Sequence, residues 1–336
     1  MAVEECGPSA EALWYVGPGR VEIRREPLGA PAPGEVRVRA IYSAISRGTE
    51  RLVSAGRVPE TEYERMRAPF MAGAFPFPVK YGYAMVGRVE IGPAELRDRV
   101  VFALHPHQTV FTLPAEAVLP IPDGLAPARA VLAANMETAL NAVWDAAPAA
   151  ADHIAVVGAG VVGSLVAFLC GRIPGARVTL VDVEPSRAGL AHRLRVGFAL
   201  PGAASADRDL VIHASGTAGG LATALVLAGD EATVLELSWH GAGDVAVPLG
   251  GAFHSRRLRL VSSQVGQVAP SHRPRWTRRR RLAAALDLLA DDRLDALIAP
   301  AVALHELPMR LPEILARESG ALCQLVAYPA PDAAAP

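Results

Sequence analysis

Three glycines, Gly158, Gly160 and Gly163, form the spacing Gly-x-Gly-x-x-Gly in VVGAGVVG. The motif follows a predicted strand over 153–158 and opens a predicted helix over 162–172. In that context Gly158 permits a tight turn, Gly160 lets a phosphate approach the backbone, and Gly163 lets the helix pack against the strand. The free N–H groups at the start of the helix attract anionic phosphates. The motif predicts a dinucleotide site that also includes Ala159, Val161 and Val162.

Asp182 ends the next predicted strand and indicates which dinucleotide is bound. A carboxylate there can accept hydrogen bonds from the adenosine ribose hydroxyls and repels a 2′-phosphate, so the sequence favours NAD over NADP. Arg187 lies shortly after it. Its guanidinium could stack on adenine or pair with a phosphate, and it could equally be a solvated helix residue.

Other polar residues follow the predicted strands at the edge where ligands bind in such sheets. Ser215 and Gly216 come after the strand LVIHASG, and we expect both to lie near the dinucleotide. His213 stands in the same stretch, where we expect its backbone to matter more than its side chain. Trp239 and His240 follow the next strand, and Thr138 is a candidate cofactor contact on a long predicted helix over 127–147.

Two kinds of hydrophobic pattern divide the chain. Apolar and polar residues alternate in the first third, as in half-buried strands. From residue 153, short apolar runs alternate with helical stretches, which predicts a parallel sheet covered on both faces. The last segments, 297–307 and 323–329, resemble the first third, so we expect the chain to return to its first domain. The predicted strands are 21–27, 34–46, 78–92, 98–104, 109–114, 153–158, 177–182, 210–216, 232–238 and 258–266, with 196–202 as a candidate sixth strand of the parallel sheet.

Composition excludes several classes of protein. The 336 residues suffice for two domains, and 51% hydrophobic residues can form a sizeable core. Lys and Arg number 33 against 34 Asp and Glu, without the basic excess of a nucleic-acid binder. Three cysteines without a CxxC spacing offer neither a disulfide framework nor a thiolate zinc site. The N-terminal residues lack the pattern of a signal peptide, so we expect a cytoplasmic protein with no membrane partner.

The run RPRWTRRRR over 273–281 is the one strongly basic segment. It could meet an anionic ligand, an acidic partner or a nucleic acid. An acidic stretch, DLLADDR, follows it within a predicted amphipathic helix over 281–293. We therefore interpret the run as the solvated start of that helix.

The order of these parts resembles the medium-chain dehydrogenases/reductases. The blocks GEVRVRAIYSAISRGTE, PVKYGYAMVGRVE, DRVV and IPDGL match that family in order, and ISRGTE, KYGYAMVG and SSQVG are similar to a zinc-free subgroup that includes bacteriochlorophyllide dehydrogenase-like proteins. The resemblance implies an α/β fold: a Rossmann doubly wound parallel sheet over 126–296, and a β-rich GroES-like catalytic domain formed by both chain ends, 1–125 and 297–336. It also implies a small-molecule substrate and allows a homodimer.

The chain departs from the zinc enzymes of that family at every ligand position. Arg47 stands in place of the catalytic Cys, Tyr83 and Ala84 replace the His-Glu pair, and the third ligand falls near Ala134. No other group of Cys, His and carboxylate residues has metal-ligand spacing in the sequence. We therefore expect no zinc and no other metal.

Without zinc, another group must meet the negative charge that develops on a substrate oxygen. Tyr83 could donate a proton, and Arg47 could supply a cation that lowers the tyrosine pKa. Arg47 could instead form an ion pair with Glu50, and Lys80 is a second, less favoured cation. The remaining candidates for proton transfer are Thr49, Glu50 and His107.

These residues favour an NAD(P)-dependent dehydrogenase that interconverts a secondary alcohol and a ketone without zinc. Two alternatives stay open. The same fold could reduce a polarised C=C bond, or it could bind a dinucleotide without catalysing a reaction.

Overall fold

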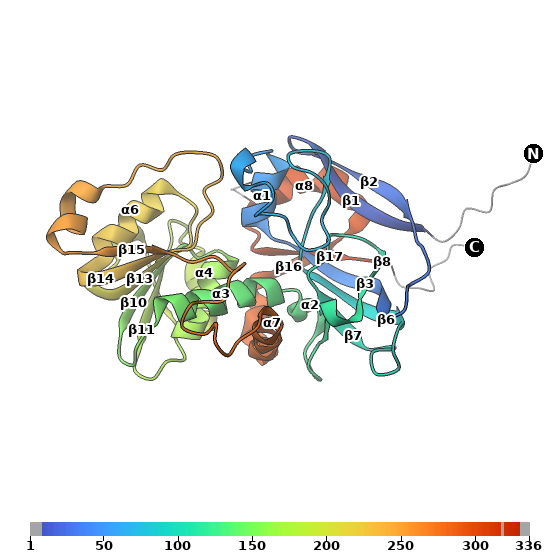
Figure 1. Ribbon diagram of the computed structural model, residues 1–336. Helices are drawn as coiled ribbons and strands as arrows, with labels where there is room; N and C mark the ends of the chain where they lie inside the picture. The colour runs from blue at the N-terminus through green and yellow to red at the C-terminus, as the bar shows by residue number, and fades with distance from the viewer. Residues whose placement is uncertain (1–8, 317–318, 330–336) are drawn as a thin grey trace, which may run out of the picture. The chain divides into compact units, whose positions relative to one another are not determined.

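The computed structural model describes residues 9–316 and 319–329 (Figure 1). The chain forms two compact units, Met1–Ala134 with Ile298–Pro336, and Asn135–Leu297. The sequence placed the first boundary at residue 125, whereas the structure places it after Ala134. The helix expected over 127–147 is in fact two helices, α2 (Pro127–Ala130) and α3 (Ala133–Ala146), and α2 packs against strands of the first unit.

The second unit is built on one sheet of six parallel strands in the order β12-β11-β10-β13-β14-β15. The order runs outward in both directions from β10, and right-handed crossovers then place helices on opposite faces. Both faces are therefore covered, which is why the central strands are continuous apolar runs. The strands are β10 (His153–Val157), β11 (Arg177–Val181), β12 (Gly197–Ala199), β13 (Arg208–His213), β14 (Ala228–Glu236) and β15 (Arg259–Ser262).

Helices connect these strands and cover them. Helix α4 packs on β10 and β11, and α6 packs on β13, β10 and β14. The helices of this unit besides α3 are α4 (Val161–Cys170), α5 (Arg187–Leu194), α6 (Ala218–Leu227) and α7 (Arg278–Asp287), with short helical turns at η3 (Pro201–Ala203), η4 (Leu249–Phe253), η5 (Leu288–Ala290) and η6 (Asp292–Leu297).

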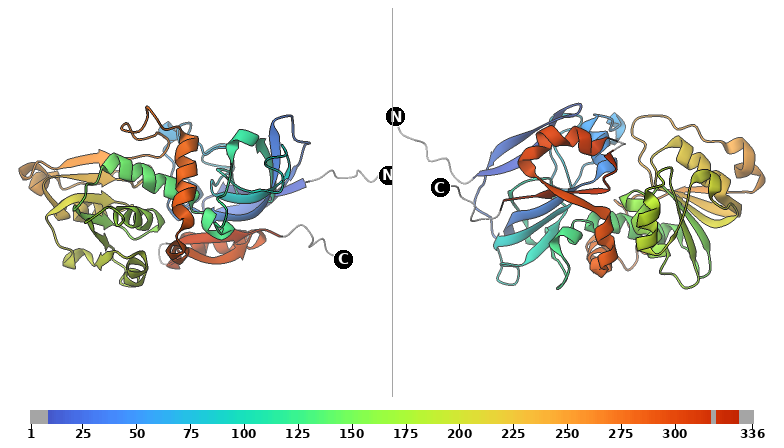
Figure 2. Two further views of the ribbon diagram at one scale, coloured as in Figure 1. Left: turned by 90° about the horizontal axis from the view of Figure 1, so that it is seen from below. Right: turned by 180° about the vertical axis from the view of Figure 1, so that it is seen from behind.

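The first unit is β-rich and contains both ends of the described chain (Figure 2). A seven-stranded sheet has the order β16-β17-β3-β6-β7-β9, and β8 also pairs with β3. The C-terminal strand β17 runs antiparallel to β3, so the chain returns to its first unit. The strands are β3 (Glu35–Ile45), β6 (Met85–Ile91), β7 (Val100–Ala103), β8 (Val110–Pro114), β9 (Val118–Pro120), β16 (Ile298–Ala303) and β17 (Cys323–Ala327).

A smaller sheet in this unit has the order β2-β1-β5-β4. The sequence analysis did not predict β1, because two adjacent residues, Ala12 and Leu13, are both fully buried and break the alternation. The strands are β1 (Ser9–Gly17), β2 (Arg20–Pro27), β4 (Ala72–Gly73) and β5 (Val79–Lys80). The helices of the unit besides α2 are α1 (Arg47–Ser54) and α8 (Leu307–Leu315), with short turns at η1 (Glu60–Glu62), η2 (Ala115–Ala117) and η7 (Leu304–Glu306).

The fold class is thus confirmed: a doubly wound Rossmann sheet accompanied by a β-rich GroES-like unit formed by both ends of the chain. Among the described residues, no helix combines the length and the apolar character needed to cross a membrane.

The basic run over 273–281 is not uniformly solvated, and that expectation is wrong for Arg281. This side chain is 1% exposed and donates a hydrogen bond of 2.9 Å to Glu137 Oε1. It also donates to Asn141 Oδ1 and to the carbonyls of Val265 and Gln267. Because α7 buries Arg281, Leu282 and Ala285 on one face, the fourth arginine of RRRR turns inward while the first three stay exposed.

Candidate functional site

The glycine-rich turn joins β10 to α4 and has the form that the motif predicted. Gly158 has φ +109°, and a Cβ added there would lie 2.7 Å from Ser215 Cα. A Cβ on Gly163 would lie 1.9 Å from the Gly158 carbonyl oxygen. Gly160, which precedes the first residue of α4, is exposed, and no atom lies within 4 Å of its Cβ position. The two outer glycines are therefore required by packing, whereas the middle one leaves open space at the helix start.

Asp182 follows β11 and reaches back to this turn. Its Oδ2 accepts a 2.6 Å hydrogen bond from the Ala159 backbone N–H, and its Oδ1 accepts one of 2.9 Å from Glu184 N–H. Each carboxylate oxygen can accept a second bond, so a ribose hydroxyl could still be bound. The half-buried Arg187 begins α5, which follows.

Ser215 and Gly216 lie beyond the end of β13, and the close approach of Ser215 to Gly158 brings that segment to the same turn. Gly216 has φ +66° and its N–H donates to Ser238 Oγ. Four predicted positions, Gly158, Ala159, Asp182 and Ser215, are thus brought together at the carboxyl ends of β10, β11 and β13. Val161 and Val162 begin α4, and Thr138 lies half-buried on α3.

In the first unit, Glu50 and His107 meet in a fully buried network. Both side chains are 0% exposed, and His107 Nε2 lies 3.1 Å from Glu50 Oε2. Glu50 also accepts hydrogen bonds from the Tyr15 hydroxyl at 2.6 Å and from the Ser46 N–H at 2.7 Å. On its other side, His107 Nδ1 bonds Ser43 Oγ. Through the bond from Ser46 N–H, Glu50 ties this network to the residue before α1.

Tyr83 lies beside the start of α1. Its hydroxyl donates to Ser46 Oγ at 2.5 Å and lies 3.1 Å from Thr49 Oγ1. Burial raises the pKa of Tyr83 to about 12, and the hydrogen bonds with Ser46 and Thr49 only partly oppose that rise. The expected lowering of the Tyr83 pKa by a neighbouring cation is therefore wrong, because desolvation outweighs every other influence on the phenol.

Arg47 donates its guanidinium hydrogens to backbone carbonyls near the end of α8. Nε bonds Ile314 O at 2.8 Å, and the terminal nitrogens bond Ala316 O and Ala321 O. Carbonyls at a helix C-terminus attract cations, which explains the placement. Lys80 forms an ion pair of 2.7 Å with Glu26 and also bonds Gln108.

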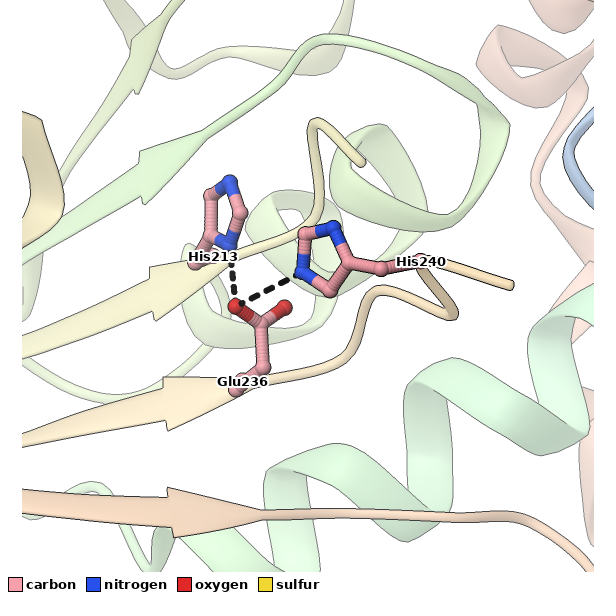
Figure 3. A group of neighbouring side chains, drawn as sticks. All are labelled: His213, Glu236 and His240. Carbon is pink, nitrogen blue, oxygen red and sulfur yellow. Dashed lines mark hydrogen bonds and ion pairs between the residues drawn. The ribbon is translucent and has the colours of Figure 1, made fainter. Parts of the chain in front are cut away.

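Sequence reasoning missed one cluster entirely. His213, Glu236 and His240 come together at the carboxyl ends of β13 and β14, with potential ligand atoms within 4.8 Å of one another (Figure 3). The two histidines were noted separately, but Glu236 was not noted at all. Only the parallel register of β13 and β14 pairs His213 with Glu236, and no pattern of neighbouring residues in the sequence reveals that register.

Comparison with known proteins identifies the fold. No family model and no curated protein matches the sequence. Solved structures do match over nearly the whole chain. A Sinorhizobium meliloti protein named a zinc-binding dehydrogenase, bound to NADP, has 19% identity and a TM-score of 0.75, covering 95% of this chain and 99% of its own. An Escherichia coli protein named a short chain alcohol dehydrogenase, complexed with NADH, has 15% identity and a TM-score of 0.74, covering 96% and 100%. An alcohol dehydrogenase of Thermus sp. ATN1 has 20% identity and a TM-score of 0.71, covering 95% and 100%.

At these identities the likeness concerns the fold. The chain has the fold of the medium-chain dehydrogenases, a Rossmann unit with a GroES-like unit.

Proposed function

We propose that the protein is an NAD(P)-dependent oxidoreductase of the alcohol dehydrogenase kind, and that it interconverts a secondary alcohol and a ketone without a catalytic zinc. The observation that carries the proposal is the glycine-rich turn. Gly158 and Gly163 are packed against backbone, Gly160 is left open at a helix start, and Asp182 is bonded to the same turn. The fold shared with NADP- and NADH-bound dehydrogenases supports this reading.

The residues fit a nicotinamide dinucleotide. The open backbone at Gly160 and the N–H groups that begin α4 would hold the pyrophosphate, and Asp182 would hold the adenosine ribose. When bound, the dinucleotide supplies or accepts the hydride.

The residues at the family's zinc positions do not fit zinc. The Arg47 guanidinium donates hydrogen bonds to backbone carbonyls. The Tyr83 phenol stays protonated at neutral pH, and the Ala134 side chain has no atom that could bind a metal. None of the three is a Cys, a His or a carboxylate, which are the ligands that zinc takes. The proposed reaction uses no metal at these positions.

We assign to Tyr83 the role of proton donor to the substrate oxygen. With a pKa of about 12 its hydroxyl stays protonated at neutral pH. Its single hydrogen, which bonds Ser46 Oγ, would turn to a bound carbonyl oxygen and be transferred as that oxygen gains negative charge. The phenolate left behind would accept hydrogen bonds from the Ser46 and Thr49 hydroxyls until a proton from water restores it. Ser46 and Thr49 hold the hydroxyl in place, and Glu50 fixes Ser46 through its backbone N–H. In this proposal Glu50 and His107 act through Ser46 and α1 and do not touch substrate.

The proposed function is tested by turnover. The protein is incubated with NADH and a panel of ketones, or with NAD and secondary alcohols, and the near-ultraviolet absorbance of NADH is followed. We expect a substrate-dependent change. Fluorescence titration that shows NADH binding, with no turnover on alcohols, ketones or enones, would instead identify a non-catalytic dinucleotide-binding protein, and turnover on enones alone would identify a C=C reductase.

Chelation should leave the reaction intact. Dialysis against EDTA is expected to leave kcat essentially unchanged, because Arg47, Tyr83 and Ala134 offer no zinc site to empty. The measurement is kcat before and after dialysis, with the metal content of both samples determined in parallel. Because His213, Glu236 and His240 could bind a metal elsewhere, the same dialysis is done on His240→Ala. A loss of kcat that added Zn²⁺ restores in both proteins would show that the zinc-free assignment is wrong.

Replacing Asp182 tests the preference for NAD. Asp182→Ala removes an anion that favours ribose hydroxyls and repels a 2′-phosphate, so Kd for NADH should rise by about 5–30-fold while Kd for NADPH rises less or falls. Both constants are measured by fluorescence titration. Glu184→Ala is the control, since it removes an exposed carboxylate from the same loop and keeps the Glu184 N–H that bonds Asp182. Wild-type protein that binds NADPH as tightly as NADH would refute the assignment to NAD.

A further inference from the structure

The cluster of His213, Glu236 and His240 lies at the carboxyl edge of the Rossmann sheet. His213 and Glu236 are the last residues of the neighbouring strands β13 and β14 and stand opposite each other in the parallel register. His240 follows at i+4 from Glu236. Figure 3 shows both imidazole rings directed at the same carboxylate. The sheet positions His213 and Glu236, and the loop after β14 carries His240.

Two members of the cluster are held firmly. His213 is 0% exposed, and its Nδ1 lies 2.6 Å from Glu236 Oε2. The far ring nitrogen, Nε2, lies 2.7 Å from Ser215 Oγ, which fixes the orientation of the ring. The other carboxylate oxygen, Oε1, accepts a 2.6 Å hydrogen bond from Ser238 N–H. Metal-binding histidines have the same arrangement, with one nitrogen on the ion and the other on an oxygen.

His240 supplies an independent observation. Its Nε2 is buried and forms an ion pair of 3.6 Å with Glu236 Oε2, but it has no hydrogen-bond partner among the described residues. A buried polar atom without a partner is unfavourable, and such atoms are rare in folded proteins. A cation between this nitrogen, His213 Nδ1 and the carboxylate would satisfy it. A hydrogen-bonded Ser-His-Glu network alone would explain His213 and Glu236 but gives His240 Nε2 no hydrogen bond.

We propose that His213, Glu236 and His240 bind one divalent transition-metal ion of the Zn²⁺ class, with a fourth position open to water. Two imidazoles and one carboxylate suit Zn²⁺ and Co²⁺. The site differs from the family's zinc positions, which fall at Arg47, Tyr83 and Ala134 in the first unit. The sequence predicted no metal-binding cluster, because the sheet register that brings His213 beside Glu236 and the loop that returns His240 to them leave no local pattern.

Binding requires a proton rearrangement within His213. In the neutral ring, Nδ1–H donates to the ionised Glu236 carboxylate, whereas a metal ion needs the lone pair of Nδ1. The ring proton moves to Nε2, where Ser215 Oγ accepts it, and the Ser215 hydroxyl hydrogen turns away from the ring. The imidazole stays neutral and no net proton is lost. The ion would then join the segment that carries His240 to the ends of β13 and β14.

The test is a Co²⁺ titration of the untagged full-length protein after dialysis against EDTA. We expect visible d–d absorption that saturates at one equivalent, is abolished by added Zn²⁺, and is accompanied by a rise in Tm. His240→Ala and Glu236→Gln should each weaken Co²⁺ binding by at least about 100-fold. His192→Ala is the matched control, because it removes an exposed histidine from α5 in the same unit and should bind Co²⁺ as the wild type does.

Three results would overturn the proposal: no saturable absorption, unchanged binding in His240→Ala, or an equal loss in His192→Ala. Circular dichroism and Tm of metal-free His240→Ala show whether that variant is folded, and Glu236→Gln, which is nearly isosteric, keeps the test decisive if it is not. None of these measurements depends on catalytic turnover. Failure of the metal site therefore leaves the proposed oxidoreductase standing, and failure of the oxidoreductase leaves the metal site standing.

Discussion

Tyr83→Phe is expected to lower kcat for ketone reduction by about 10²–10⁴-fold while Kd for NADH stays unchanged. The substitution removes only the hydroxyl that donates to Ser46 and lies beside Thr49, and it keeps the ring that packs edge-on against Tyr81. The loss should appear in kcat because the proton is needed only as negative charge develops on the substrate oxygen. Steady-state kinetics together with a fluorescence titration of NADH separate the two constants.

The control for this experiment is Tyr81→Phe. Tyr81 is a buried tyrosine in the same segment, and its ring contact with Tyr83 is preserved in phenylalanine. Its kcat should stay close to that of the wild type. Because burial raises the pKa of Tyr83 to about 12, wild-type ketone reduction should show no loss from Tyr83 ionisation up to about pH 10. A Tyr83→Phe variant with wild-type kcat would remove Tyr83 as the proton donor.

Alanine substitutions at Gly163 and Gly160 are both expected to weaken NADH binding, but only the one at Gly163 should lower the stability of the fold. A Cβ at residue 163 would lie 1.9 Å from the Gly158 carbonyl oxygen, so the turn and α4 must move apart. Such overpacking costs about 1–3 kcal/mol of folding free energy, lowers Tm by several degrees, and should weaken NADH binding by more than about 100-fold. A Cβ at residue 160 meets no protein atom within 4 Å. Gly160→Ala should therefore keep the wild-type Tm and still weaken NADH binding by about 10–100-fold, because the methyl group occupies the space that a phosphate needs.

The pair is measured by thermal unfolding and by NADH titration of each variant. Gly160→Ala serves as the matched control for Gly163→Ala, since both add one methyl group to the same turn. Wild-type NADH affinity in Gly160→Ala would show that no phosphate approaches this turn, and the dinucleotide site would have to be placed elsewhere.

Local patterns sufficed to predict the segment from β10 to β11. The spacing of Gly158, Gly160 and Gly163 and the apolar runs around it depend on neighbours in the chain, and strand, turn and helix followed from them. The parallel sheet could also be predicted, because alternating short strands and helices have few ways to bury their apolar faces. Patterns failed where burial departs from a simple period. The strand β1 has adjacent buried residues, and Arg281 is turned into the core by the geometry of α7.

The hydrogen-bond partners of the polar side chains could not be predicted from local sequence patterns. An ion pair with Glu50 was one alternative for Arg47. The Arg47 guanidinium instead bonds carbonyls from residue 314 onward, and Glu50 bonds Tyr15 and His107. Each of these contacts joins segments separated by tens to hundreds of residues, so strand order and register choose them.

By itself, the sequence determined the two kinds of domain, the glycine-rich turn and the position of Asp182 directly after β11. These features depend on short-range spacing and on the period of burial. The tertiary structure alone decided that Glu50 and His107 are buried together, that the pKa of Tyr83 rises, and that His213, Glu236 and His240 converge. The physical reason is that desolvation and side-chain pairing depend on which strand ends become neighbours, and neighbouring strand ends here come from residues far apart in the chain.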